Sequence, residues 1–131
     1  MAQTLQKIYS DIDFNFTRTP GRNDVAVSYD EMAVIRSVRN LLLTRNYERP
    51  FQPELGSNIR RLLFEPIDSI VASSLERQLQ ETIENFEPRV SLELVDVKSL
   101  PDYNSYQVTI TFYIENLVQP FTADFILSRL R

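Results

Sequence analysis

The hydrophobic pattern of this chain changes its period at Pro88, and this change constrains the fold more than any other feature. Before Pro88, apolar residues recur at helical spacing over Ile67, Val71, Leu75, Leu79 and Ile83. After Pro88, apolar residues alternate with polar ones, as in strands with one buried face. The sequence therefore predicts an α+β fold, with helices first and strands last.

Three alternating runs follow Pro88, separated by the turn-forming stretches "LPDYNSY" and "ENLVQP". Consecutive alternating runs joined by turns are typical of an antiparallel meander with one apolar face. We predict a three-stranded meander within residues 89–131, with the N-terminal helices packed on one of its faces. In the first run Val90, Leu92 and Leu94 share that face, and a register break is expected before Val97.

The helical part is predicted over residues 28–86. Ser28 and Glu31 have the spacing of a capping box, which predicts a helix from Ser28 to about Thr44. The expected buried stripe of this helix contains Met32, Ile35, Val38 and Leu42.

The tripeptide Phe-Glu-Pro occurs at residues 64–66 and again at 86–88. Pro66 is expected in the first turn of a long helix, where its missing N–H costs nothing. Pro88 ends the same helix, because it cannot extend the hydrogen-bond ladder. A shorter helix before them is expected to be capped by Ser57.

Residues 1–27 are polar and irregular, and they are too short to form a domain. The chain is therefore expected to form one domain over residues 1–131, with 1–27 as an extended segment. The proline-containing stretch 44–57 is a long connection for so small a domain. Such loops are usually functional or packed by their own side chains.

The chain lacks two residue types that most common catalytic mechanisms need. The chain has no cysteine and no histidine, which excludes disulfides, thiolate metal sites and the commonest general base. A glycosidase would need two carboxylates, and the candidates are Glu48, Glu54, Glu65 and Glu87. Each has a simpler structural role, so we expect no enzyme activity, cofactor, metal or small-molecule substrate.

The charge balance narrows the class of partner. A net charge of -4 disfavours binding to nucleic acid, and no apolar run is long enough to span a membrane. Only two of the fourteen basic residues are lysines. Arginine suits desolvated pairing with carboxylates at protein interfaces, although compositional bias explains the excess equally well.

Glu87 and Arg89 flank Pro88, and residues two apart in an extended segment point the same way. Such a pair would face a partner's arginine and carboxylate together. In the alternative, Arg89 binds the last carbonyls of the preceding helix, where a cation is favoured.

A meander of three strands has two open edges, which can receive a strand from another chain by β-augmentation. The alternative is that residues 1–27 supply the missing strand, through Asp13 to Thr17.

The stretches "IYSDIDFNF", "DEMAVIRSVRNLLLTRNYERPFQPELGSNIRRLLFEP" and "NFEPRV" resemble the small baseplate wedge protein of contractile phage tails. That family is often labelled lysozyme-like and is related to a type VI secretion baseplate component. The resemblance covers nearly the whole chain. Many members have glycine before the acidic residue of "ERPF", where this chain has Asn46-Tyr47, so a different turn geometry is expected there.

The resemblance implies a structural protein of the virion's tail baseplate, assembled in the host cytoplasm. The partners it implies are the tail sheath, other wedge subunits, and the tail tube or hub. Glu87, Pro88 and Arg89 would dock on the helical core bundle of the wedge, and a sheath strand would add to the last strand. The residues expected to meet that strand are Phe121, Ala123, Asp124, Phe125 and Ile126. A peptidoglycan-degrading tail lysozyme is the alternative.

Overall fold

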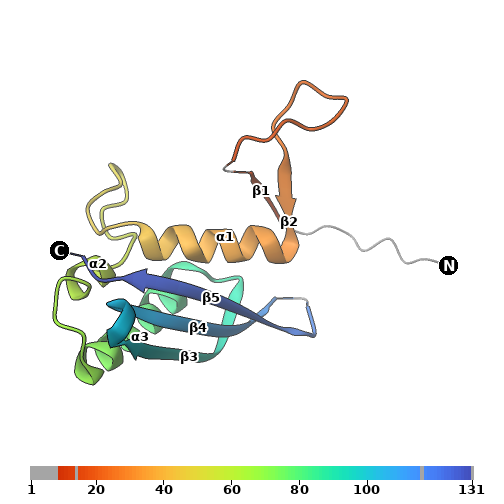
Figure 1. Cartoon of the computed structure of the whole chain (residues 1–131). Helices are drawn as coiled ribbons and strands as arrows, with labels where there is room; N and C mark the ends of the chain where they lie inside the picture. The colour runs from red at the N-terminus through yellow and green to blue at the C-terminus, as the bar shows by residue number, and fades with distance from the viewer. Residues whose placement is uncertain (1–8, 14, 116, 131) are drawn as a thin grey trace.

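The computed structural model describes residues 9–13, 15–115 and 117–130, and it has an α+β body from which an N-terminal hairpin projects (Figure 1). The predicted fold class is confirmed, because the helices cover one face of a C-terminal three-stranded antiparallel sheet. The elements in chain order are β1 (Ser10–Ile12), β2 (Val27–Tyr29), α1 (Asp30–Leu43), α2 (Ile59–Leu62), α3 (Ser69–Phe86), β3 (Val90–Leu100), the 3-10 turn η1 (Pro101–Tyr103), β4 (Ser105–Ile114) and β5 (Pro120–Ser128).

Strand β4 lies between β3 and β5 and carries the centre of the core. The residues of β4 predicted to face inward are each at most 1% exposed, namely Tyr106, Val108, Ile110, Phe112 and Ile114. On β3 the register shifts between Leu92 and Leu94, one step earlier than the sequence indicates. This β-bulge turns Val95 and Val97 inward and leaves Leu94 exposed, so the prediction for Leu94 is wrong.

Helix α3 packs against the sheet through Leu75, Leu79 and Ile83, as its spacing predicts. It begins at Ser69, because the Asp68 carboxylate accepts the Ser69 N–H (2.6 Å) and caps the first turn. Pro66 therefore lies before the helix and not in its first turn, which corrects the prediction. The helix ends at Phe86, as Pro88 requires.

Helix α1 begins at Asp30, and its N-cap position is Tyr29. Ser28 lies in β2, so the predicted capping box with Glu31 is wrong. The side chains that α1 buries are Ala33, Val34, Val38, Leu41 and Leu42. Met32, predicted to be buried, is exposed. Apolar residues cover a wide arc of this helix, so their spacing alone does not decide which of them face the core.

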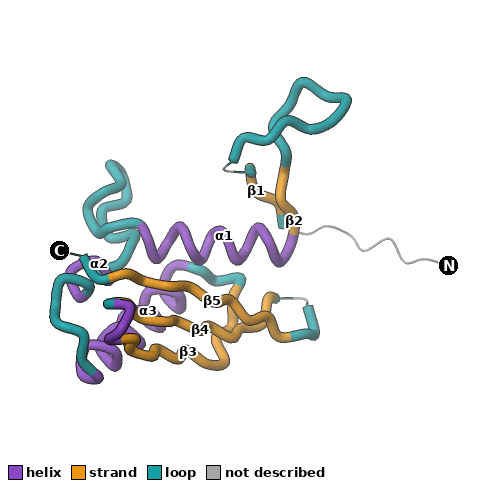
Figure 2. The backbone as a smooth tube through the Cα atoms, in the orientation of Figure 1, coloured by secondary structure: helices purple, strands orange, loops and turns teal. Residues whose placement is uncertain are grey.

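The loop between α1 and α2 extends from the body (Figure 2), and hydrogen bonds between its own backbone groups hold its shape. Tyr47 N–H donates to Pro53 C=O (2.8 Å), and Ser57 N–H donates to Thr44 C=O (2.9 Å). Ser57 is buried and donates its hydroxyl to Leu42 C=O (2.7 Å), while Asn58 is the N-cap residue of α2, which corrects the cap predicted at Ser57. Tyr47 has a φ of 67°, a left-handed conformation that glycine adopts without strain. The expected difference in turn geometry from other family members stays a prediction.

The N-terminal hairpin forms a two-stranded sheet of its own, in which Ser10 pairs with Tyr29 and Ile12 with Val27. Within the part of the chain that the structure describes, it adds no strand to the β3-β4-β5 sheet. The alternative that residues 13–17 complete the sheet is therefore wrong for the described residues. Both β3 and β5 remain edge strands there.

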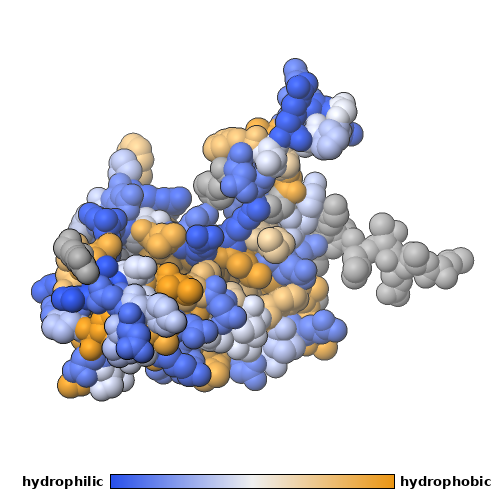
Figure 3. Space-filling model, viewed as in Figure 1, coloured by the Kyte–Doolittle hydropathy of each residue, from blue (hydrophilic) through white to orange (hydrophobic). Residues whose placement is uncertain are grey.

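Hydrophobic residues interrupt the hydrophilic surface in the middle of the body on the face shown in Figure 3. None of the helices within the described ranges has the length and hydropathy needed to cross a membrane.

Replacing a buried leucine of α3 should destabilise the fold strongly. Leu75→Ala or Leu79→Ala should each lower the free energy of unfolding by about 2–5 kcal/mol, because a cavity would remain beneath the sheet. The matched control is Ile70→Ala, on the exposed side of the same helix, which should change it by less than about 0.5 kcal/mol. Urea unfolding measures both, and equal effects would contradict the packing described here.

Candidate functional site

The Glu87 carboxylate is the most enclosed charge of the predicted docking motif, since Glu87 is 4% exposed. It accepts hydrogen bonds from Arg89 Nε (2.6 Å) and Arg89 Nη2 (2.8 Å). A third comes from the Ser37 hydroxyl of α1 (2.6 Å). Three donors satisfy a buried carboxylate well, so Glu87 joins α1 to the end of α3.

Arg89 is held between Glu87 and an aromatic ring. Its guanidinium lies 5.4 Å from the centre of the Tyr9 ring, a cation–π distance. Its carbonyl accepts the Glu115 N–H (2.9 Å), which fixes the segment to the end of β4. Glu87 and Arg89 thus lie side by side but bind each other, while Pro88 between them is exposed. Neither of the two arrangements considered from the sequence describes this contact.

The electrostatics of this corner favour the charged pair. Burial alone would raise the pKa of the Glu87 carboxyl, but the hydrogen bonds from Arg89 and Ser37 together outweigh burial and lower that pKa. The hydrogen bond to Glu87 raises the pKa of Arg89, against the opposing effect of burial. Both groups are therefore ionised at neutral pH.

The hairpin is attached to α1 by contacts that the sequence does not reveal. Arg36 of α1 donates to the Asp13 carboxylate (2.6 Å), which also accepts the Thr17 hydroxyl. The hydrogen bond from Thr17 lowers the pKa of Asp13 against the effect of burial, and the Asn15 N–H and Arg36 lower it further. Tyr9 N–H donates to the Asp30 carboxylate (3.1 Å). These contacts place the Tyr9 ring beside Arg89.

The five residues predicted to receive a strand lie along β5 but divide between its two faces. Phe121, Ala123 and Phe125 point toward the core and are buried or half-buried. Asp124 and Ile126 are exposed on the other face, where Asp124 accepts a hydrogen bond from the Thr109 hydroxyl (2.7 Å).

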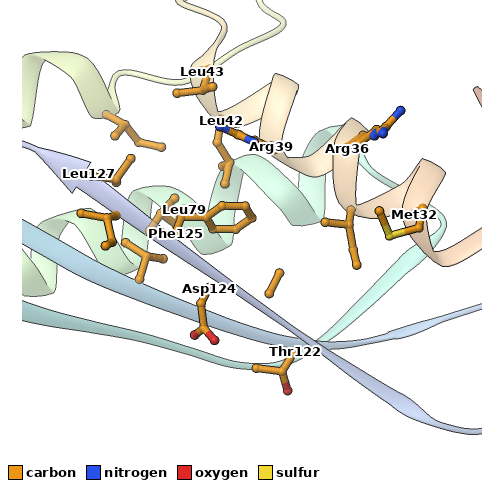
Figure 4. A pocket seen from close by; sticks show the side chains of 15 residues that line it. Met32, Arg36, Arg39, Leu42, Leu43, Leu79, Thr122, Asp124, Phe125 and Leu127 are labelled. Carbon is orange, nitrogen blue, oxygen red and sulfur yellow. The ribbon is translucent and has the colours of Figure 1, made fainter. Parts of the chain in front are cut away.

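A groove of about 660 Å³ lies between α1 and β5 (Figure 4). Leu42 of α1 and Phe125 and Leu127 of β5 contribute to its apolar lining. Arg36 and Arg39 line it from α1. The groove therefore follows the edge of the sheet at which a further strand would lie.

A second groove, of about 510 Å³, runs along a different face of α1. Asp11 and Glu87 line it at the docking corner. Glu48, Arg49 and Leu55 line it from the α1–α2 loop. The corner and the loop thus share one depression of the surface.

Glu48 and Glu87 line the same groove, but the four candidate catalytic carboxylates differ in their environments. Glu87 is engaged with Arg89 and Ser37, whereas Glu48, Glu54 and Glu65 are exposed. In the described portion of the chain, no cluster of acidic residues is arranged to hold a metal ion.

Residues 28–119 match the family model described as "Baseplate wedge protein gp25". The baseplate wedge protein gp25 of Enterobacteria phage T4 is 31% identical over 106 residues, which are 81% of this chain and 78% of that protein. The chain belongs to the gp25 baseplate wedge family. The predicted resemblance is confirmed, and the chain is a baseplate wedge protein of a contractile-tail system.

Solved structures share the fold. A protein of Geobacter sulfurreducens described as a tail lysozyme has a TM-score of 0.74, with 20% identity over 82% of this chain and 97% of that chain. A component of the anti-feeding prophage baseplate has a TM-score of 0.71 and 23% identity, and the match covers 85% of this chain and 89% of that chain. A component of the type VI secretion baseplate has a TM-score of 0.54 and 16% identity, and the match covers 74% of this chain and 93% of that chain.

The Glu87 ion pair should make stability depend on pH in one direction. Because folding lowers the Glu87 pKa from its ordinary value of 4.5, the stabilisation is present above that pH. It is lost as the pH falls through the lower pKa of the folded state. Glu87→Gln should therefore be less stable than the wild type at neutral pH, and the difference should shrink in acid.

Urea unfolding from pH 7 to about pH 2.5 measures this difference. Glu81→Gln, on the exposed side of α3, controls for the loss of one negative charge. A difference between wild type and Glu87→Gln that stays constant over this range would contradict the assignment.

Proposed function

We propose that this chain docks on neighbouring wedge subunits through the Glu87-Pro88-Arg89 corner and starts the sheath by strand addition at β5. Membership of the gp25 baseplate wedge family supports a role in the baseplate of a contractile tail. The open β5 edge beside an apolar groove is the observation that carries the mechanism. The expected contact with the tail tube or hub stays a prediction.

The two edges of the sheet differ in their fitness to receive a strand. Edge β3 carries the bulge between Leu92 and Leu94, a feature that interrupts regular pairing and protects edges. Edge β5 pairs with β4 without a break from Pro120 to Ser128. An incoming strand at β5 would also place alternate side chains into the groove beneath α1. These differences favour β5.

At the docking corner, Arg89 is the group that can bind a partner. Glu87 already accepts three hydrogen bonds, so it orients the guanidinium and does not receive a partner's arginine. The Arg89 side chain is 29% exposed, and a guanidinium has five N–H donors, of which two bind Glu87. A carboxylate of the neighbouring subunit is the matching group.

A tail lysozyme is the alternative, because one protein of the same fold is described as such. Glycoside hydrolysis needs a carboxyl group whose pKa is raised so that it can donate a proton. The ion pair instead lowers the pKa of Glu87, the most buried of the four candidate carboxylates. A peptidoglycan zymogram should show no clearing, and clearing abolished by one glutamate substitution would overturn the structural assignment.

The docking role of Arg89 can be separated from its structural role. Arg89→Ala alone would leave Glu87 buried with only Ser37, so the test variant combines it with Glu87→Gln. This pair of changes should weaken association with co-expressed wedge subunits by about 2–5 kcal/mol while the isolated protein still folds. Arg89→Lys should also weaken it, because an ammonium cannot form the fork. Association that simply follows the stability of each variant would argue against docking here.

Strand addition at β5 can be tested with proline. Neighbouring N–H groups of an edge strand point alternately toward β4 and outward, so Ala123→Pro and Asp124→Pro remove opposite donors. The variant that loses the outward donor should stay folded and form baseplates that lack sheath. The other variant should lose stability, because it breaks the β4–β5 ladder. Electron microscopy of assembled tails counts baseplates with and without sheath. Normal sheaths on every folded β5 variant would exclude strand addition at this edge.

A further inference from the structure

The α1–α2 loop presents two aromatic side chains to solvent. Tyr47 is 84% exposed and Phe51 is fully exposed, at 102%. Burying a large aromatic side chain contributes strongly to stability, and neither residue obtains this benefit within the chain. Large aromatic residues exposed together are typical of interface hot spots.

Both residues also have a strained backbone. Tyr47 has a φ of 67° and Phe51 a φ of 35°, and residues with bulky side chains rarely adopt such values. Each such conformation is energetically unfavourable and persists only when its surroundings enforce it. The two rings gain no burial within the chain that would offset this cost, whereas burial against a partner would offset it.

The loop is rigid enough to hold this conformation. Its ends are joined by the hydrogen bond from Ser57 N–H to Thr44 C=O. Within it, Tyr47 N–H donates to Pro53 C=O and Arg45 N–H donates to the Glu48 carboxylate (2.9 Å). Gly56 packs so tightly that an added Cβ would lie 2.7 Å from Thr44 O. A preorganised loop loses little conformational entropy when it binds a partner.

The charge around the loop is opposite to that of the whole chain. Residues 36–61 contain six arginines and two glutamates, a balance of +4, in a chain whose net charge is -4. The described ion pairs are Arg36–Asp13, Arg89–Glu87 and Lys98–Asp96, so Arg45, Arg49 and Arg60 belong to none of them. This surface would attract carboxylates.

The loop is continuous with the proposed docking corner. The groove that begins at Asp11 and Glu87 reaches Glu48 and Arg49, as described above. A third depression, lined by Arg45, Tyr47 and Arg60, shares Leu43 and Glu48 with that groove. A partner seated at the corner can therefore follow the surface to the loop.

We propose that the arginine–aromatic loop, residues 44–57, is a second contact for the wedge subunit that docks at Arg89. The inference rests on the proposed function. The partner surface it requires has an apolar cleft for Tyr47 and Phe51, edged by carboxylates that pair with Arg45, Arg49 and Arg60.

Arginine and aromatic residues together can also bind single-stranded nucleic acid. Two observations favour a protein. Glu48 and Glu54 lie within the loop itself and would repel phosphates. The groove that joins the loop to the corner contains Leu41, Leu43 and Leu55, which suit apolar side chains better than a sugar-phosphate backbone.

Tyr47→Gly separates a binding role from a structural one. Glycine relieves the positive φ, so urea unfolding of the isolated protein should give an unchanged or higher midpoint. Tyr47→Gly combined with Phe51→Gly should weaken binding to the co-expressed wedge subunits of the same tail at least about 30-fold. Arg49→Glu should also weaken it, and raised salt should reduce wild-type binding.

The matched control is Tyr103→Ala, since Tyr103 is 79% exposed and lies outside the α1–α2 loop. It should bind like the wild type. A photoreactive phenylalanine analogue at position 51 should crosslink to a wedge subunit at a site containing carboxylates. Wild-type affinity in the glycine variants, or a nuclease-sensitive crosslink, would overturn the inference. Failure of the wild type itself to bind wedge subunits would instead overturn the proposed function.

Discussion

The buried Glu87 carboxylate is the interaction on which the arrangement of this protein depends. It lies where α3 ends and β3 begins, and it accepts hydrogen bonds from Arg89 of the same corner and from Ser37 of α1. Removing one partner of a buried ion pair is costly, because the remaining charge has no solvent to stabilise it. Glu87 therefore fixes α1 relative to the end of α3, and it holds Arg89 in place beneath the Tyr9 ring.

The position of α1 in turn shapes the two surfaces proposed for assembly. One side of the helix faces β5 across the larger groove, while another borders the groove from Glu87 to the α1–α2 loop. Val34 and Val38 are fully buried between these two sides and anchor the helix in the core. The placement of this one helix therefore sets both the groove beside the β5 edge and the groove at the proposed docking corner.

The sequence predicts the framework well, because apolar periodicity reports which faces are buried. The inward residues of β4 and the Leu75, Leu79 and Ile83 row of α3 follow directly from it. Helix starts were less predictable, since a serine or proline competes with nearby residues for the same cap, as Asp68 does at α3. The contacts of the corner are only partly predictable. Glu87 and Arg89 are two residues apart, so their proximity follows from the sequence, but Ser37 is 50 residues from Glu87 and its contact does not. The hairpin contact between Asp13 and Arg36 has no local signal.

Rigidity decides how these surfaces can work together. The proposed docking at Arg89 would use an ion pair that is already formed, and the proposed strand addition would use an edge that is already open, so neither step would need the core to rearrange. Preformed contacts lower the entropy lost on binding, which suits a subunit that assembles with other baseplate proteins. The same reasoning applies to the strained residues Tyr47 and Phe51, because a backbone that is already held in one conformation loses little entropy when a partner binds. The β5 groove and the corner groove share only Leu43 among their lining residues, so the proposed strand and the proposed docked subunit would use largely separate surfaces.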